Sequence, residues 1–180
     1  MKSLLIGIAL FCLSAVSAAA DRTAIIKKII GYEHSVSYDP FPGFGDCVDE
    51  GGASISLNNK WTGFGYSIVR CGRDRLLVLD KIIGEEDGQP RVRILDAIVL
   101  PKFDRYDAEN EKKSKQLSPN GICMLDGHGD TSMQVLLRWG GHKRVTSKNG
   151  VLAAWGFNVE KGKIIRLDIS RIVCEEPDDP

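Results

Sequence analysis

Four cysteines constrain the fold of this 180-residue chain more than any other residues. The chain has five cysteines, and Cys12 lies in an N-terminal segment that has the features of an export signal and is expected to be removed with it. The remaining four, Cys47, Cys71, Cys123 and Cys174, are an even number, which in an oxidising compartment predicts two disulfides. Three pairings are possible, and the sequence alone does not separate them. We favour Cys47 with Cys71, which would close a Gly-rich loop, and Cys123 with Cys174, which would hold the C-terminal strand.

The spacing of these cysteines disfavours two other uses. Zinc ligands usually come in closely spaced cysteine pairs, and none of the four is close in sequence to another. A thioredoxin-like redox centre needs a CxxC motif, which the chain lacks. We therefore expect structural disulfides and no cofactor.

The first twenty residues have the order of a secretory signal peptide. Lys2 supplies the positive charge, Leu4–Val16 the apolar segment, and Ala18–Ala20 a small-residue cleavage site before Asp21. The apolar segment is shorter than the roughly 20 residues of a transmembrane helix, and no later segment approaches that length. The chain also lacks an Asn-x-Ser/Thr glycosylation site, which favours a bacterial periplasm. We predict a periplasmic or secreted protein, cleaved near Ala20, with no membrane span.

The charge balance argues against a nucleic-acid partner. Loss of Lys2 with the signal leaves 23 basic and 24 acidic residues. The basic residues are scattered among acidic ones, whereas a nucleic-acid-binding module shows a basic stripe interleaved with aromatic side chains.

Apolar and polar residues alternate along much of the chain after Gly52, which is typical of half-buried strands. Two such runs, 76–83 and 92–100, flank a turn-rich segment at 84–90. Pro101 ends the second run because it lacks the amide that a central ladder requires. The pattern predicts a β-hairpin.

The residues before these strands predict a helix. Isoleucines recur at helical spacing over about residues 21–30, and Gly31 ends the segment. We therefore predict an α+β fold that is predominantly antiparallel β with a short N-terminal helix. Residues 21–180 form a single disulfide-stapled domain in this interpretation, with a polar interruption at about 103–120.

The C-terminal region predicts a second hairpin, turning at 160–163, with one face buried. Trp155 is expected in the core because its strand neighbours share its apolar parity. The residues expected on this buried face are Trp155, Phe157 and Val159 on the first strand and Ile165, Leu167 and Ile169 on the second.

Two aspartates lie within the predicted strands. Asp80 and Asp96 invite interpretation as a carboxylate pair for acid/base chemistry. Charged residues on strands more often mark the solvated face or a protected edge, and this is the placement we expect.

One compact cluster has side chains that bind metals or move protons. Asp126, His128 and Asp130 alternate with glycines, so a tight backbone would bring two carboxylates and an imidazole around one cation. Asp-Gly and Gly-Asp pairs also form ordinary turns, and a turn is expected before the strand at 133–139. The turn is the favoured interpretation, and a metal site is the alternative.

Aromatic residues in loops are the candidate binding residues. Trp61 lies in a polar turn, where a tryptophan either plugs the domain or is presented to a partner. Tyr38, Phe41 and Phe44 lie in a loop with two prolines, which either folds onto the core or is exposed to a partner. We favour folding onto the core for this loop.

The C-terminal third resembles the tail of small exported proteins of Gram-negative bacteria that have no assigned activity. The resemblance rests on Val135–Trp139, Ala154–Trp155, Gly162–Lys163 and Cys174–Glu175. It implies a periplasmic setting and a β-rich fold, and it implies no catalytic residues.

The sequence lacks the motifs of common catalytic sites. It has no Gly-x-Ser-x-Gly elbow, Walker A loop, dinucleotide fingerprint or His-Glu-x-x-His helix. The leading hypothesis is therefore a non-catalytic binding protein, an inhibitor or immunity protein that blocks another protein of the periplasm or envelope. The alternatives are a metal-dependent hydrolase that uses Asp126, His128 and Asp130, and an envelope carbohydrate-binding module that uses Trp61 and the loop from Tyr38 to Phe44.

Overall fold

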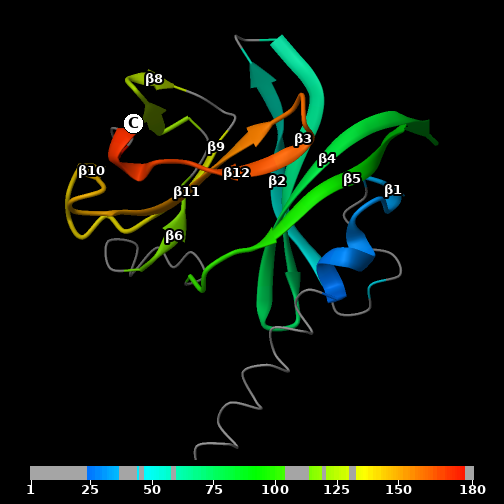
Figure 1. The fold of residues 1–180 in the computed structure, drawn as a ribbon, viewed down its shortest axis with the longest axis horizontal. Helices are drawn as coiled ribbons and strands as arrows, with labels where there is room; N and C mark the ends of the chain where they lie inside the picture. Colours follow the sequence, from blue (N-terminus) through cyan, green and yellow to red (C-terminus); the bar gives the residue numbers. More distant parts are fainter. Residues whose placement is uncertain are drawn as a thin grey trace, which may run out of the picture.

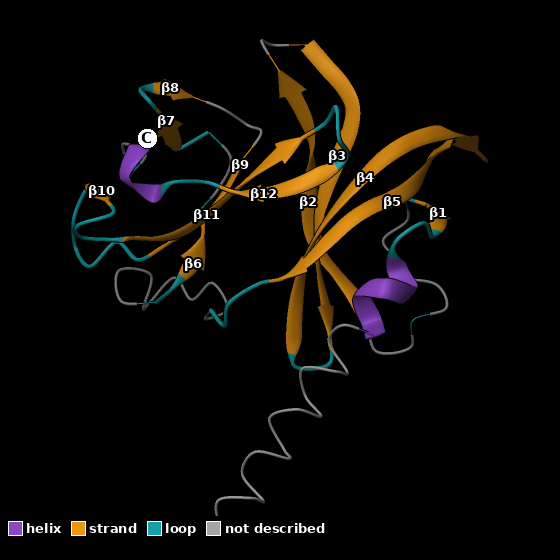
Figure 2. Cartoon of the chain, viewed as in Figure 1, coloured by secondary structure: helices purple, strands orange, loops and turns teal. Residues whose placement is uncertain are grey.

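A computed structural model describes residues 24–36, 44, 47–57, 60–103, 114–118, 121–129 and 133–176. Within these ranges the chain forms thirteen strands in three antiparallel sheets, with one short α-helix over residues 24–29 and a 3-10 helix, η1 (Ile169–Arg171). Figures 1 and 2 show that strands dominate the molecule. The predicted signal peptide and Asp21 lie outside the described residues. No helix in the described part has the length and apolar character needed to cross a membrane.

The five-stranded sheet has the order β1-β5-β4-β3-β2. Its strands are β1 (Glu33–Ser35), β2 (Cys47–Leu57), β3 (Lys60–Cys71), β4 (Asp74–Glu86) and β5 (Gln89–Val99). The predicted β4–β5 hairpin is confirmed, with a shorter turn than the sequence suggested. Asp87 and Gly88 have φ angles of 52° and 76°, as both central residues of a type I′ turn require, so the strands continue to Glu86 and resume at Gln89.

Two four-stranded sheets complete the fold. The central sheet has the order β12-β11-β9-β6, and the C-terminal sheet has the order β10-β13-β7-β8. The central strands are β6 (Gln116–Leu117), β9 (Met133–Leu137), β11 (Val151–Asn158) and β12 (Lys163–Arg166). The C-terminal sheet contains β7 (Cys123–Leu125), β8 (His128–Gly129), β10 (Arg144–Thr146) and β13 (Ile172–Glu175).

Three hydrophobic clusters join these layers. The helix packs through Ile29 on one face of the five-stranded sheet, against Val69, Leu76 and other residues. The opposite face packs on the central sheet, where Leu77 and Leu79 meet Trp155 and other residues. A third cluster fills the space between the central and C-terminal sheets. As a result, residues 76–79 of β4 and all of β9 are buried on both faces.

Both predicted disulfides are confirmed. Cys47 and Cys71 lie directly opposite each other on β2 and β3, and Cys123 and Cys174 lie opposite each other on β7 and β13. All four residues are buried and belong to hydrophobic clusters. Each disulfide therefore fixes the register of a strand pair as well as closing a loop.

The C-terminal hairpin forms as predicted, but the parity expected for Ile165 on its second strand is wrong. Leu167 and Ile169, which follow that strand, pack against the cluster between the central and C-terminal sheets. Phe157 pairs with Ile164, and Gly156 pairs with Ile165. Cross-strand partners share a face, so Ile164 packs with Phe157 in the core while Ile165 is 44% exposed. Trp155 is 4% exposed, which confirms its core placement.

The solvated placement expected for Asp80 and Asp96 is also wrong. The Asp96 carboxylate accepts hydrogen bonds from the backbone N–H of Ile164 at 2.9 Å and from Lys163 Nζ at 3.2 Å. Asp96 therefore links β5 of the five-stranded sheet to β12 of the central sheet. Asp80 is half-buried on β4, opposite Gly65 of β3, whose backbone hydrogen-bonds to it.

One buried hydrogen bond also joins the two sheets. Gln134 Nε2 on β9 donates to Tyr66 Oη on β3 at 2.7 Å, and the Tyr66 ring stacks on Phe157 with centroids 5.0 Å apart. Tyr66→Phe keeps the stacking and removes the acceptor. We expect it to lower the free energy of unfolding by about 1–2 kcal/mol, because a buried amide loses this partner.

Urea denaturation measures this loss, and a double-mutant cycle separates it from packing. Tyr66→Phe combined with Gln134→Leu is expected to cost less than the sum of the single changes, because each single change already removes the same hydrogen bond. Additive costs would show that the hydrogen bond contributes nothing specific.

Candidate functional site

Trp61 lies at the tip of the β2–β3 hairpin, which projects at the top of the view in Figure 1. The ladder pairs Ile55 with Phe64 and then Ser56 with Trp61, so Thr62 and Gly63 form an outward irregularity. Thr62 Oγ1 donates to the Ile55 carbonyl at 2.6 Å, which fixes this irregularity. A hydrogen-bonded irregularity of β3 therefore directly follows the tryptophan.

The Trp61 side chain is 61% exposed, the largest fraction among the exposed large hydrophobic residues of the described part. The other two tryptophans, Trp139 and Trp155, are 2% and 4% exposed. Of the two roles open to a tryptophan in this turn, presentation to solvent is therefore the one observed. Lys60 beside it is also exposed.

The other candidate aromatic residues do not join Trp61 in the described structure. Phe44 is half-buried, packs against the cluster under the helix, and meets Tyr32 edge-on with ring centroids 5.0 Å apart. For Phe44 alone, this is the packing onto the core that was favoured for the loop. Tyr38 and Phe41 lie outside the described residues.

The Asp126 segment forms the expected turn. Asp126 and Gly127 have φ angles of 52° and 78° and connect β7 to β8, where Leu125 pairs with His128. The Asp126 carboxylate accepts from Arg171 Nε at 3.0 Å and from Arg171 Nη2. These hydrogen bonds hold the pKa of Asp126 below its usual range.

The arrangement around Asp126 does not bring three metal-binding side chains together. Both carboxylate oxygens face the Arg171 guanidinium, and His128 is exposed on the short strand β8. Asp130 lies outside the described residues. Among the described residues, no group of three or more His, Cys, Asp or Glu side chains is placed to hold a metal ion.

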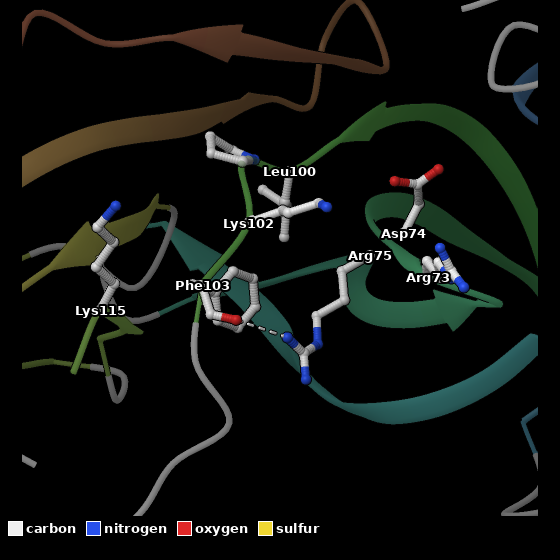
Figure 3. Close-up of a pocket in the computed structure, with 8 residues that line it drawn as sticks. Arg73, Asp74, Arg75, Leu100, Lys102, Phe103 and Lys115 are labelled. Atoms are coloured by element: carbon white, nitrogen blue, oxygen red, sulfur yellow. Dashed lines mark hydrogen bonds between the residues drawn. The ribbon is translucent and has the colours of Figure 1, made fainter. Parts of the chain in front are cut away.

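A concave surface that the sequence reasoning missed lies beside the β3–β4 turn. We call it the basic pocket; its volume is about 640 Å³. Figure 3 shows Lys115 and the Arg73–Asp74 turn on opposite sides of Phe103. The described residues that line it are Arg73, Asp74, Arg75, Leu100, Pro101, Lys102, Phe103 and Lys115. They come from three separated segments, so no local motif signals the pocket.

Asp80 is the described carboxyl group whose pKa is raised. Burial is the main cause, the nearby charge of Asp49 adds to it, and a backbone hydrogen bond from Gly65 opposes it; together they raise the pKa of Asp80 to about 6. Neither the basic pocket nor the hairpin tip includes this side chain.

Comparisons with protein-family models, with curated proteins and with solved structures find no match to this chain.

Proposed function

We propose that this chain is a non-catalytic binding protein of the periplasm or another exported compartment, of the inhibitor or immunity type. The tip of the β2–β3 hairpin is its recognition element, and Trp61 is the residue that inserts into a partner protein. The observation that carries this proposal is the 61% exposure of Trp61 at the projecting end of β3, beside the hydrogen bond from Thr62 to the Ile55 carbonyl.

Physical reasoning supports recognition over packing for this side chain. A tryptophan buries about 150–250 Å² when it is covered, and tryptophans are enriched among the residues that dominate interface energies. Trp61 contributes little to the described hydrophobic clusters, none of which includes it. The two disulfides and the absence of a membrane-crossing helix in the described part fit an exported protein.

Affinity capture from periplasmic extract tests the proposal with three baits: the wild type, Trp61→Ala and Ile165→Ala. Ile165 is a matched control because it is also an exposed large hydrophobic residue, on β12. We expect a stoichiometric partner with the wild type and the control, and its loss with Trp61→Ala. For the purified complex, Trp61→Ala weakens binding about 30-fold or more, which corresponds to about 2 kcal/mol.

Tryptophan emission provides a second readout. Because Trp139 and Trp155 are buried, a blue shift on adding partner reports on Trp61. Repeated capture of no stoichiometric partner, or equal binding by Trp61→Ala, would contradict the proposal. An emission shift with peptidoglycan fragments in place of protein would instead support the carbohydrate-binding alternative.

A further inference from the structure

The basic pocket arises from the way β5 leaves the five-stranded sheet. Leu100 N–H still donates to the Arg75 carbonyl at 2.8 Å, and Pro101 then ends the ladder because it has no amide hydrogen. The chain therefore leaves the sheet at this point and carries Lys102 and Phe103 past the side chain of Arg75. The tight turn before β4 presents Arg73 on the other side.

Arg75 lines the pocket, but its positive charge is already paired with other groups of the protein. Its Nε pairs with Glu50 Oε2 at 2.6 Å, and its Nη1 donates to the Phe103 carbonyl at 3.0 Å. The guanidinium also lies 4.5 Å from the centre of the Phe103 ring. Glu50 pairs with Arg70 as well, at 2.9 Å, so its charge is shared between two arginines.

Two exposed cations line the rest of the described pocket. Arg73 and Lys102 are exposed, and neither forms an ion pair with another described residue. Lys115 also lines the pocket, from the segment that enters β6. Asp74 is the single acidic residue among the described lining residues. Separate cations held around one concavity raise the local potential for anions.

We propose that the basic pocket binds a small ligand that carries two or more phosphate or carboxylate groups. Its volume lies within the range of about 300–1,000 Å³ that is usual for small-molecule sites. The Arg73 guanidinium and the Lys102 ammonium group come from two separate segments and suit two anionic groups joined by a short linker. Leu100, Pro101 and the Phe103 ring provide apolar contact for that linker.

Isothermal titration with inorganic pyrophosphate and with citrate, at constant low ionic strength, tests this site. We expect one binding site per chain for at least one of the two anions. The Arg73→Ala, Lys102→Ala double variant is expected to weaken that binding tenfold or more. Both side chains are exposed, so their removal is not expected to affect folding. Preference for pyrophosphate or for citrate then identifies the ligand as a phosphate or a carboxylate.

A variant with the same change in net charge separates the pocket from general attraction. Lys148 and Lys161 are exposed in turns that do not line the pocket. The Lys148→Ala, Lys161→Ala variant is expected to bind within about twofold of the wild type, because exposed charges outside the pocket are screened by salt. Equal weakening by both double variants, or no binding of either anion by the wild type, would overturn the proposal.

The site and the hairpin tip are tested independently. Trp61→Ala leaves anion binding unchanged if the proposal is correct, since Trp61 does not line the pocket. Backbone amide shifts from NMR locate the bound anion, with the largest changes expected at Arg75, Lys102 and Phe103. Shifts confined to other regions would place the anion elsewhere and overturn the assignment.

Discussion

Replacement of Cys123 and Cys174 by alanine is expected to lower the free energy of unfolding by about 4 kcal/mol. The two cysteines are 51 residues apart in sequence, and the chain-entropy model gives about this value for a loop of that length. The disulfide also joins β7 to β13 inside the cluster that packs the C-terminal sheet on the central sheet. Its loss therefore raises the conformational entropy of the unfolded chain and removes the covalent link between β7 and β13.

The second disulfide provides a matched comparison. Cys47 and Cys71 are 24 residues apart and also join directly opposed residues, so the same double replacement is expected to cost about 3.5 kcal/mol. Urea denaturation under non-reducing conditions measures both losses, and the m-value should rise because the unfolded chain becomes less compact. A larger loss for the shorter loop would show that local packing, and not loop entropy, decides the ranking.

The cysteine pairing and the hairpins are the parts of the fold that the sequence predicted best. Period-two alternation and Asp-Gly turns act locally, so the β4–β5 hairpin and the β7–β8 turn follow from neighbouring residues. The predicted cysteine pairing was also correct, and in both pairs the two cysteines lie opposite each other on adjacent antiparallel strands. The predicted helix exists, and its described part is limited to residues 24–29.

The errors concern strand register and contacts between sheets, which local sequence patterns do not specify. Asp96 was expected in solvent because a strand sequence does not show that Ile164 and Lys163 of β12 will supply donors. Ile165 was expected in the core because it is apolar and was assigned the same face as Phe157. Which residues of the second strand share that face depends on the register of the turn, and the sequence leaves this register open. The basic pocket was missed because Arg73, Lys102 and Lys115 come together only when the sheets pack.

The exposure of Trp61 was easier to predict than the surroundings of Asp126. A tryptophan among polar turn residues has a local signature, and the structure exposes Trp61 at the hairpin tip. Asp126 and His128 had an equally local signature, but the partner of Asp126 is Arg171, which lies 45 residues away in sequence. Long-range pairing of this kind is not visible in the spacing of the cluster itself.

Asp80→Asn is expected to stabilise the protein by about 3 kcal/mol at pH 7. The folded pKa is about 6, against 3.8 for an unperturbed aspartate, because burial and the Asp49 charge disfavour the ionised form. A group whose folded pKa is raised takes up a proton on folding between these two values. Stability therefore falls as pH rises from about 4 to about 6, and the full cost, about 1.4 kcal/mol for each pKa unit, is present at pH 7.

The neutral amide of asparagine keeps the shape of the side chain and an oxygen that can accept the Gly65 N–H, without the buried charge. The gain should vanish near pH 4, where Asp80 is protonated in the folded protein, and grow towards pH 7. Urea denaturation at several pH values measures this difference. Asp49→Asn is a second test, since removal of the neighbouring charge should lower the pKa of Asp80 and recover part of the stability.

Asp96→Asn is the control that distinguishes a buried charge from any loss of an acidic residue. Asp96 accepts hydrogen bonds from Ile164 and Lys163, so its neutralisation weakens a link between sheets and is expected to cost about 1 kcal/mol. The same Asp→Asn change is therefore expected to raise the free energy of unfolding at position 80 and to lower it at position 96, on the adjacent strand. A destabilising Asp80→Asn at pH 7, or a stabilisation that does not depend on pH, would show that the Asp80 charge is compensated in the folded protein.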